Sequence, residues 1–255
     1  YANRMPDPVL QQVEHFNNPG ITANDAFKPV TRYFDRITRP EQIIQSFPAA
    51  VQTMLDPADC GPACIALSQD IQGQTFDYPE EFFKERVHAI RRPRPDEFQI
   101  KEAAEKIKSS KNPIIISGGG VFYSDAMEEL SQFATKHNIP VTQTVMGYST
   151  MKRDHSHFAG QIGGLGGKNT NNLAKETDLA IAVGTKLADF TTGSWANFEN
   201  ENFKLVSINV SRFDANKHLA QAVIGDAKVS LTELSQALGN WKAGDEWNKK
   251  SQIEL

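Results

Sequence analysis

The sequence lacks long hydrophobic runs, an excess of positive charge and a recognisable secretory signal. No stretch approaches the roughly 18 consecutive apolar residues of a membrane-spanning helix, so we expect no membrane partner. Lys and Arg number 27 against 31 Asp and Glu, for a net charge of −4. This balance argues against a nucleic-acid partner, because such proteins carry a basic stripe. The chain opens on Tyr1 rather than Met, so we expect a preceding segment.

Cysteine is scarce as well. Cys60 and Cys64, both in DCGPACIAL, are the two cysteines of the sequence. Two are too few for a disulfide framework, and the six histidines are scattered rather than grouped into a metal site. We therefore expect two free thiols that pack as small hydrophobic groups at the start of a buried strand, in a reducing, cytoplasmic compartment.

The standard nucleotide motifs are incomplete. Residues 114–126, IIISGGGVFYSDA, read as a strand, a glycine turn and a helix start. A dinucleotide fingerprint needs G-x-G-x-x-G, and its third glycine position is occupied by Tyr123. The acidic residue expected about 20 positions later is missing, and no G-K-[ST] of a phosphate-binding loop follows. The glycines can still form a tight turn, or expose N–H groups to an anion, and both interpretations remain open.

A second glycine cluster is present at residues 160–167, GQIGGLGG, with five glycines in eight positions. The strand LAIAV ends in Gly184 and Thr185. Ligands of open α/β sheets bind at the carboxyl ends of the strands, so this edge is a possible nucleotide site. Our candidate cofactor-binding residues are Gly118, Gly119, Gly120, Gly163, Gly164, Gly184 and Thr185. No catalytic residue and no metal ligand can be assigned.

Two weaker candidates have simpler interpretations. His155 and His157 form an H-x-H pair that could bind a metal, but no third ligand is apparent, so packing within a loop is favoured. Trp195, in TTGSWANF, either packs a loop or covers a pocket, and loop packing is the favoured interpretation.

The chain changes character along its length. Residues 1–83 contain a helix candidate at 8–16, a second at 37–55 with Pro40 in its first turn, and one clear strand, PACIALSQDI. This content predicts a partial α/β domain. Residues 84–98 are charged and contain RRPRP, as in a solvated linker.

Residues 99–240 alternate strand and helix patterns, and 241–255 form a polar tail. The alternation predicts a doubly wound, Rossmann-like parallel sheet of five or six strands. The apolar runs PIIIS and LAIAV fit strands covered on both faces. Asp125 and Glu128 are placed for a capping box, and Asp226 for the cap of the helix that follows AVIGDA.

The order of these pieces resembles a known family. GPACIALSQD, IIISGGG, TDLAIAVGTK and VIGDAKVSL follow one another as in the thiamine-diphosphate-dependent decarboxylases, which include acetolactate synthase and pyruvate decarboxylase. The amino-acid sequence of residues 27–74 and 117–126 most resembles that of the branch whose members hydrolyse a trihydroxylated cyclohexane-dione in inositol breakdown. The resemblance implies that residues 1–83 are the C-terminal half of a pyrimidine-binding domain and residues 99–240 the central domain.

The resemblance also implies the chemistry of the parent enzyme. Thiamine diphosphate, anchored by Mg²⁺, would add to a carbonyl of a small cyclic 1,2-diketone and act as the electron sink for C–C cleavage, after which water completes the hydrolysis. Such a parent is expected to be a homodimer or tetramer.

The chain lacks the family's main cofactor-binding motifs, and this limits the activity that we expect of it. The family's activating glutamate belongs to the first half of the pyrimidine domain, and its G-D-G…Asn cofactor motif to a third domain. Here Gly225-Asp226 is followed by Ala, and Gly244-Asp245 by Glu. We carry over no catalytic residue and expect a scaffold and dimer-forming fragment, inactive alone. The alternatives are a nucleotide- or FAD-binding module, an acetolactate-synthase-like lyase, or a purely structural interaction domain.

Overall fold

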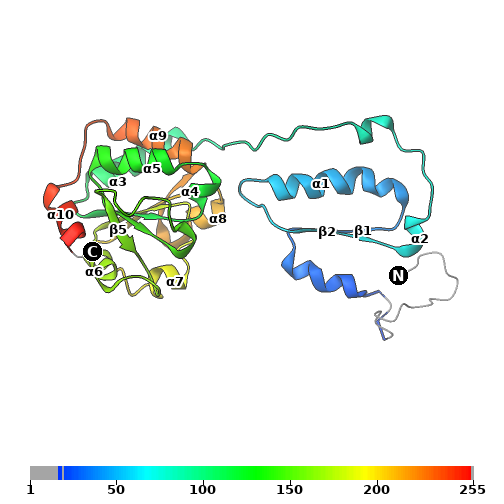
Figure 1. Ribbon diagram of the computed structural model, residues 1–255, viewed down its shortest axis with the longest axis horizontal. Coiled ribbons are helices and arrows are strands. Elements are labelled where there is room, and N and C mark those ends of the chain that lie inside the picture. The colour runs from blue at the N-terminus through cyan, green and yellow to red at the C-terminus, as the bar shows by residue number, and fades with distance from the viewer. Residues whose placement is uncertain (1–16, 19, 254–255) are drawn as a thin grey trace. The chain divides into compact units, whose positions relative to one another are not determined.

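The computed structural model describes residues 17–18 and 20–253, and the chain divides into two compact units, Tyr1–Arg91 and Arg92–Leu255 (Figure 1). The boundary falls inside the predicted linker 84–98. The helix predicted at residues 8–16 lies outside the described residues. In the described part of the chain, no helix is both long and apolar enough to cross a bilayer.

The first unit is built around a β-α-β element. Strands β1 (Tyr33–Ile37) and β2 (Ala63–Leu67) pair in parallel, and α1 (Ile43–Leu55) connects them. The predicted helix 37–55 is thus confirmed from Pro40 onward, because the short helix η2 (Pro40–Gln42) has Pro40 at its first position and leads into α1. The remaining elements of this unit are η1 (Ala23–Val30), α2 (Gln69–Gln72) and η3 (Glu80–Phe83).

The first unit differs from expectation in two ways. It has a second strand, β1, which was not predicted because its sequence YFDRI interrupts the apolar pattern with Asp35 and Arg36. Cys60 is exposed and precedes β2, whereas Cys64 lies within the strand and is partly buried, so the two thiols do not share a buried position. Both thiols are free.

The second unit contains a six-stranded parallel sheet with the order β5-β4-β3-β6-β7-β8. Counted within this unit, the order is 3-2-1-4-5-6, that of the doubly wound dinucleotide-binding fold, so the predicted fold class is confirmed. The strands are β3 (Pro113–Ser117), β4 (Val141–Gln143), β5 (Phe158–Gln161), β6 (Leu179–Val183), β7 (Lys204–Asn209) and β8 (Gln221–Ile224).

Helices cover both faces of this sheet, as Figure 1 shows. Successive side chains of a strand point to opposite faces, so Ile115 belongs to one buried cluster and Ile114 and Ile116 to the other. The first cluster lies under α3 (Glu97–Lys108), α5 (Met127–His137) and α9 (Ala227–Leu238). The second lies under α6 (Lys168–Glu176) and α10 (Asp245–Ile253).

Short helices occupy the loops between strands of this unit. They are α4 (Gly120–Tyr123), η4 (Val145–Gly147), α7 (Asp189–Thr192), α8 (Arg212–Ala215) and η5 (Lys217–Leu219). The predicted capping box of Asp125 and Glu128 is absent, because α5 begins at Met127 and Asp125 has a φ of 51°. The predicted cap at Asp226 is confirmed, since its carboxylate accepts N–H bonds from Lys228 and Val229.

The predicted tail also takes part in the fold. Trp247 of α10 is buried in the second cluster, and its indole Nε1 donates a hydrogen bond to the Pro113 carbonyl at 2.8 Å. Trp241 packs against the first cluster. Two tryptophans thus tie residues 241–253 to the sheet.

Candidate functional site

The predicted glycine edge lies at the point where the strand order of the second unit reverses. Strands β3 and β6 are neighbours there, and their carboxyl ends bring Gly118 and Gly120 onto Gly184 and Thr185. The Gly120 N–H donates to the Gly184 carbonyl at 2.9 Å, and the Gly118 N–H donates to Val183 at 2.9 Å. This is the position at which open α/β sheets bind ligands.

Backbone, however, already fills the space beside these glycines. A Cβ at Gly118 would lie 2.4 Å from the Gly184 carbonyl oxygen, and one at Gly120 would lie 2.6 Å from the Gly184 Cα. Close approach of two backbone segments therefore accounts for these glycines without a ligand. Gly119 is different, because its Cβ would meet Met146 at 3.2 Å, a tight but tolerable approach. A cofactor role for these residues remains a prediction.

The second glycine cluster lies against α7. The nearest neighbours of Gly163 and Gly164 belong to Phe190 and Thr191, and the Gly164 N–H donates to the Phe190 carbonyl at 2.7 Å. Asn171 closes the loop by accepting from the Gly163 N–H at 2.9 Å and donating to its carbonyl at 3.0 Å. These contacts explain a compact loop and leave its predicted cofactor role untested.

The Gly225-Asp226 turn is occupied by the end of the predicted linker. Arg92 Nη1 lies 3.1 Å from Asp226 Oδ2, and the Asp226 N–H donates to the Pro93 carbonyl at 2.8 Å. Pro95 packs so close to Gly225 that a Cβ there would come within 2.9 Å of it. Nothing local in RRPRP predicted this contact, and the expectation that the whole segment is solvated was wrong.

These contacts decide whether the chain can hold a diphosphate and its metal. One Asp226 oxygen caps α9 and the other pairs with Arg92, so the carboxylate is not available as a metal ligand. Asp245 accepts a hydrogen bond from the Asn138 amide at 3.0 Å. Across residues 17–18 and 20–253, no group of three or more His, Cys, Asp or Glu side chains is arranged to hold a metal ion. The described residues do not fit a thiamine diphosphate–Mg²⁺ site.

His155, His157 and Trp195 all pack against neighbouring residues of their own unit, in agreement with the loop-packing interpretation. His155 Nε2 lies 3.0 Å from the Ser131 hydroxyl, and His157 Nε2 lies 3.1 Å from the Asn138 amide oxygen. Burial, together with the neighbouring His155, lowers the pKa of His157. The Trp195 ring packs on His218, with 4.2 Å between the ring centroids.

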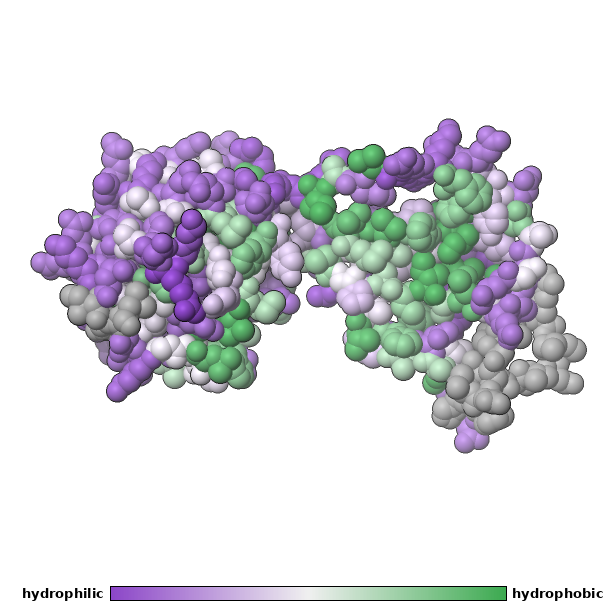
Figure 2. Space-filling model, in the orientation of Figure 1, coloured by the Kyte–Doolittle hydropathy of each residue, from purple (hydrophilic) through white to green (hydrophobic). Residues whose placement is uncertain are grey.

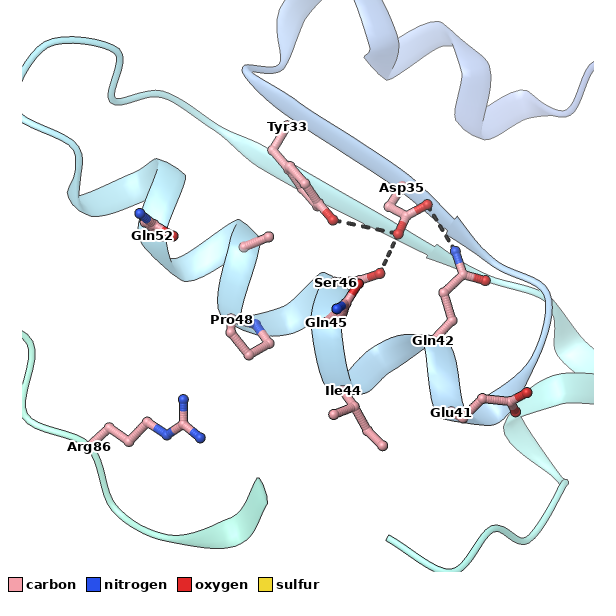
Figure 3. A pocket seen from close by; sticks show the side chains of 11 residues that line it. Tyr33, Asp35, Glu41, Gln42, Ile44, Gln45, Ser46, Pro48, Gln52 and Arg86 are labelled. Atoms are coloured by element: carbon pink, nitrogen blue, oxygen red, sulfur yellow. Dashed lines mark hydrogen bonds between the residues drawn. The ribbon is translucent and has the colours of Figure 1, made fainter. Parts of the chain in front are cut away.

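The first unit holds an open hollow of about 790 Å³ beside β1 and α1 (Figure 3). Asp35 lies on one side of it and Arg86 on the other. The Asp35 carboxylate accepts hydrogen bonds from the Ser46 hydroxyl and, at 3.0 Å, from the Gln42 amide. No signal in the sequence pointed to this hollow, because the interacting residues come together only when α1 packs on β1.

The electrostatics of Asp35 fit a structural role. Burial disfavours its charged form, but hydrogen bonds from Ser46, Gln42 and the Arg36 N–H outweigh burial and lower its pKa. The group therefore remains ionised at neutral pH and cannot donate a proton there. The hydrogen bonds join β1 to α1, and we assign this hollow no catalytic role.

Comparison of the amino-acid sequence with known proteins assigns the chain to a family. Several relatives carry the name 3D-(3,5/4)-trihydroxycyclohexane-1,2-dione hydrolase. The Clostridium perfringens protein is 49% identical over 238 residues, covering 93% of this chain and 37% of the relative. The Bacillus velezensis protein is 46% identical over 262 residues, covering 100% and 41%, and that of Bacillus subtilis is 46% identical over 246 residues, covering 95% and 38%.

The chain thus spans about two fifths of the length of these relatives. A family model described as the central domain of thiamine pyrophosphate enzymes, another name for thiamine diphosphate enzymes, matches residues 100–234. The match covers strands β3 to β8, the whole doubly wound sheet. Since it also includes more than half of the residues, the chain belongs to the thiamine pyrophosphate enzyme family.

Proposed function

We propose that this chain is part of a thiamine-diphosphate-dependent hydrolase that cleaves a C–C bond of a cyclic 1,2-dione in inositol catabolism. The observation that carries the proposal is 49% identity over 93% of the chain to a protein named for hydrolysis of 3D-(3,5/4)-trihydroxycyclohexane-1,2-dione. The same name recurs among relatives from two genera, which favours the hydrolase over an acetolactate-synthase-like lyase.

Within that enzyme, this chain would serve as scaffold and would be inactive alone. Asp226 is engaged by Arg92 and by the start of α9, so the machinery that holds the cofactor would belong to other parts of the parent. Thiamine diphosphate supplies the electron sink for C–C cleavage in that parent, and Mg²⁺ would anchor its diphosphate. We further propose that the parent is a homodimer or tetramer. We also propose a cytoplasmic location, in keeping with the two free thiols.

The domain assignment forms part of the proposal. Residues 1–83 would be the C-terminal half of a pyrimidine-binding domain, 84–98 a linker, 99–240 the central domain and 241–255 a linker or tail. The two-stranded parallel sheet of the first unit supports a partial domain, because parallel sheets are normally larger and covered on both faces. Figure 2 shows hydrophobic surface over this unit. Its exposed large apolar side chains include Phe47, Met54 and Leu67.

A calorimetric titration with thiamine diphosphate and Mg²⁺ tests the scaffold role. We expect no heat beyond dilution for this chain, because its described residues include no group of three or more His, Cys, Asp or Glu side chains that could hold the metal ion. The whole protein should bind the cofactor stoichiometrically under the same conditions. Tight one-to-one binding by this chain alone would contradict the proposal.

A further inference from the structure

Residues 241–253, which we call the strap, are held to the second unit by few apolar contacts. In Figure 1 the strap follows the end of α9 and leads into α10, drawn in red. Its buried apolar side chains include Ala243, 7% exposed, and Trp247, 6% exposed. Segments with little apolar burial open at a lower free energy than the core of a domain. The strap is therefore a segment that can detach while the sheet stays folded.

Two glycines lie where such a segment would pivot. Gly239 ends α9 with a φ of 64°, and Gly244 directly precedes α10. A Cβ built at either position meets nothing within 4 Å, so packing does not restrict the backbone there. Glycine has the widest choice of φ and ψ, and both ends of the stretch between them can rotate.

The end of α5 anchors the strap through two adjacent residues. His137 Nδ1 lies 2.8 Å from the Trp241 carbonyl, and the His137 carbonyl accepts from the Ala243 N–H at 2.9 Å. The Asn138 amide donates to the Ala243 carbonyl at 3.1 Å and to Asp245 Oδ1 at 3.0 Å. The docked position of the strap thus depends on this one helix end.

The contacts of α10 with the rest of the unit involve other kinds of group. Gln252 Nε2 donates to the Phe158 carbonyl at 2.9 Å, and Lys250 lies 2.5 Å from Glu176. These contacts contain no histidine, the side chain that most often changes charge between pH 5 and 8. A pH response of the strap would therefore arise at the α5 anchor.

The docked strap favours a neutral His137. The side chain is fully buried, and because a carbonyl can only accept, Nδ1 carries the proton that binds Trp241. Nε2 can then accept from the Ser235 hydroxyl at 3.0 Å. A second proton, on Nε2, would create a buried cation beside Lys136 of α5 and Lys242 of the strap. Burial and these two charges lower the pKa of His137.

The other groups around the anchor do not reverse this effect. Helix α9 presents the Ser235 hydroxyl, which also accepts from the Lys136 ammonium at 3.1 Å. The strap brings Asp245, whose carboxylate accepts from Asn138. The loop before β5 brings His157, whose Nε2 lies 3.1 Å from Asn138 Oδ1. Protonated His157 can keep that bond, so we assign the pH response to His137.

Release of the strap would change the surroundings of His137. It would remove Trp241 and Lys242 from the imidazole and open it to water, so that its pKa would return toward the ordinary 6.5. Below about pH 6.5 the released form would then bind more protons than the docked form. Mild acid therefore favours release, and neutral pH favours docking.

We propose that residues 241–253 are a pH-operated strap, which docks on the second unit at neutral pH and releases in mild acid, with His137 as its sensor. Release frees the C-terminal end of the described chain while the six-stranded sheet stays folded. The strap does not depend on the hydrolase proposal, so either can fail without the other.

Fluorine NMR of the chain labelled with 5-fluorotryptophan tests the strap between pH 8 and 5. The Trp247 resonance, assigned with Trp247→Phe, should move from its buried position toward that of a solvent-exposed indole as the pH falls. The ratio of released to docked strap should rise by up to about tenfold per pH unit below about 6.5. Far-ultraviolet circular dichroism should show that the sheet remains folded.

Two variants separate the sensor from the other histidines. His137→Gln should remove the pH dependence of the Trp247 resonance, because an amide can donate to the Trp241 carbonyl but carries no charge at any pH. His218→Gln is the matched control, as an exposed histidine of the same unit that packs on Trp195 instead of the strap. The control should keep the wild-type dependence.

Three results would overturn the strap. They are a Trp247 resonance that stays buried from pH 8 to 5, a loss of sheet structure that accompanies release, and a wild-type pH dependence in folded His137→Gln. If His137→Gln does not fold, Asn138→Gly decides, because glycine tolerates the φ of 54° and removes both amide bonds to the strap. More released strap at every pH supports the proposal, and an unchanged ratio contradicts it.

Discussion

Arg92 Nη1 lies 3.1 Å from Asp226 Oδ2, although 134 positions separate the two residues. The same guanidinium donates to the Ser124 carbonyl, and the other carboxylate oxygen caps α9. The pair thus fixes the first residues of the second unit to its last strand–helix turn. These contacts give the Gly225-Asp226 turn a structural role.

The Arg92–Asp226 contact predicts a graded loss of stability. Asp226→Ala removes the cap of α9 and the partner of Arg92, and should lower the free energy of unfolding by about 1–2 kcal/mol. Arg94→Ala is the control, since its ion pair with Glu233 has an arginine side chain 74% exposed and should be worth less than about 0.5 kcal/mol.

Urea unfolding followed by tryptophan fluorescence measures this difference. Trp195, Trp241 and Trp247 all belong to the second unit, so the signal reports that unit alone. Equal midpoints for the Asp226 and Arg94 variants would show that the contact does not stabilise the fold.

The glycine turn predicts a difference between neighbouring positions. Gly118→Ala and Gly120→Ala should each cost about 1–3 kcal/mol, because the added methyl would overlap the backbone at Gly184. Gly119→Ala should change stability little, since its methyl faces Met146 at 3.2 Å. The same fluorescence-detected unfolding compares the three variants, and similar losses at all three would refute the packing explanation.

The nucleotide prediction can be tested in the same samples. If these glycines serve only backbone packing, titration of wild-type chain with ADP or FAD should give no saturable signal. Saturable micromolar binding that Gly119→Val abolishes would favour the nucleotide module, because that change leaves Gly118 and Gly120 packed against Gly184.

Buried His137 predicts that the second unit loses stability in mild acid. Its side chain is fully buried, with Nδ1 2.8 Å from the Trp241 carbonyl, and burial lowers its pKa below the ordinary 6.5. Between the folded and unfolded pKa values, the unfolded chain binds more protons. The free energy of unfolding should therefore fall as pH drops below about 6.5.

Fluorescence-detected unfolding at pH 8, 6 and 5 measures this slope. His137→Gln should be less stable at pH 8 but should flatten the dependence, leaving the part due to His157, whose pKa is also lowered. His88→Gln is the control, as an exposed histidine of the first unit. An unchanged slope in His137→Gln would contradict this assignment.

The parts of the fold that the sequence predicted are those with a local signal. PIIIS and LAIAV are apolar at nearly every position because both faces of their strands are covered, so β3 and β6 were recognisable. Strand β1 was not, since Asp35 is satisfied by Ser46, a partner 11 residues away. Its polarity became compatible with a strand only through tertiary contacts.

The candidate site was harder to predict than the fold. The sequence showed that Tyr123 breaks the dinucleotide fingerprint and placed the glycines at a strand edge. Whether Gly118 faces a ligand or Gly184 depends on which strands are neighbours, and a strand order is not a local property. The Arg92–Asp226 contact and the burial of Trp247 likewise join distant segments.

The proposal that this chain is the non-catalytic part of a dione hydrolase is tested most directly by a paired activity measurement. Whole protein and this chain are incubated with 3D-(3,5/4)-trihydroxycyclohexane-1,2-dione, thiamine diphosphate and Mg²⁺, and ring opening is followed by loss of the dione. We predict hydrolysis by the whole protein, dependent on the cofactor, and none by the chain. Hydrolysis of the dione by the chain alone would contradict the proposal. So would a whole protein that does not hydrolyse the dione but condenses pyruvate.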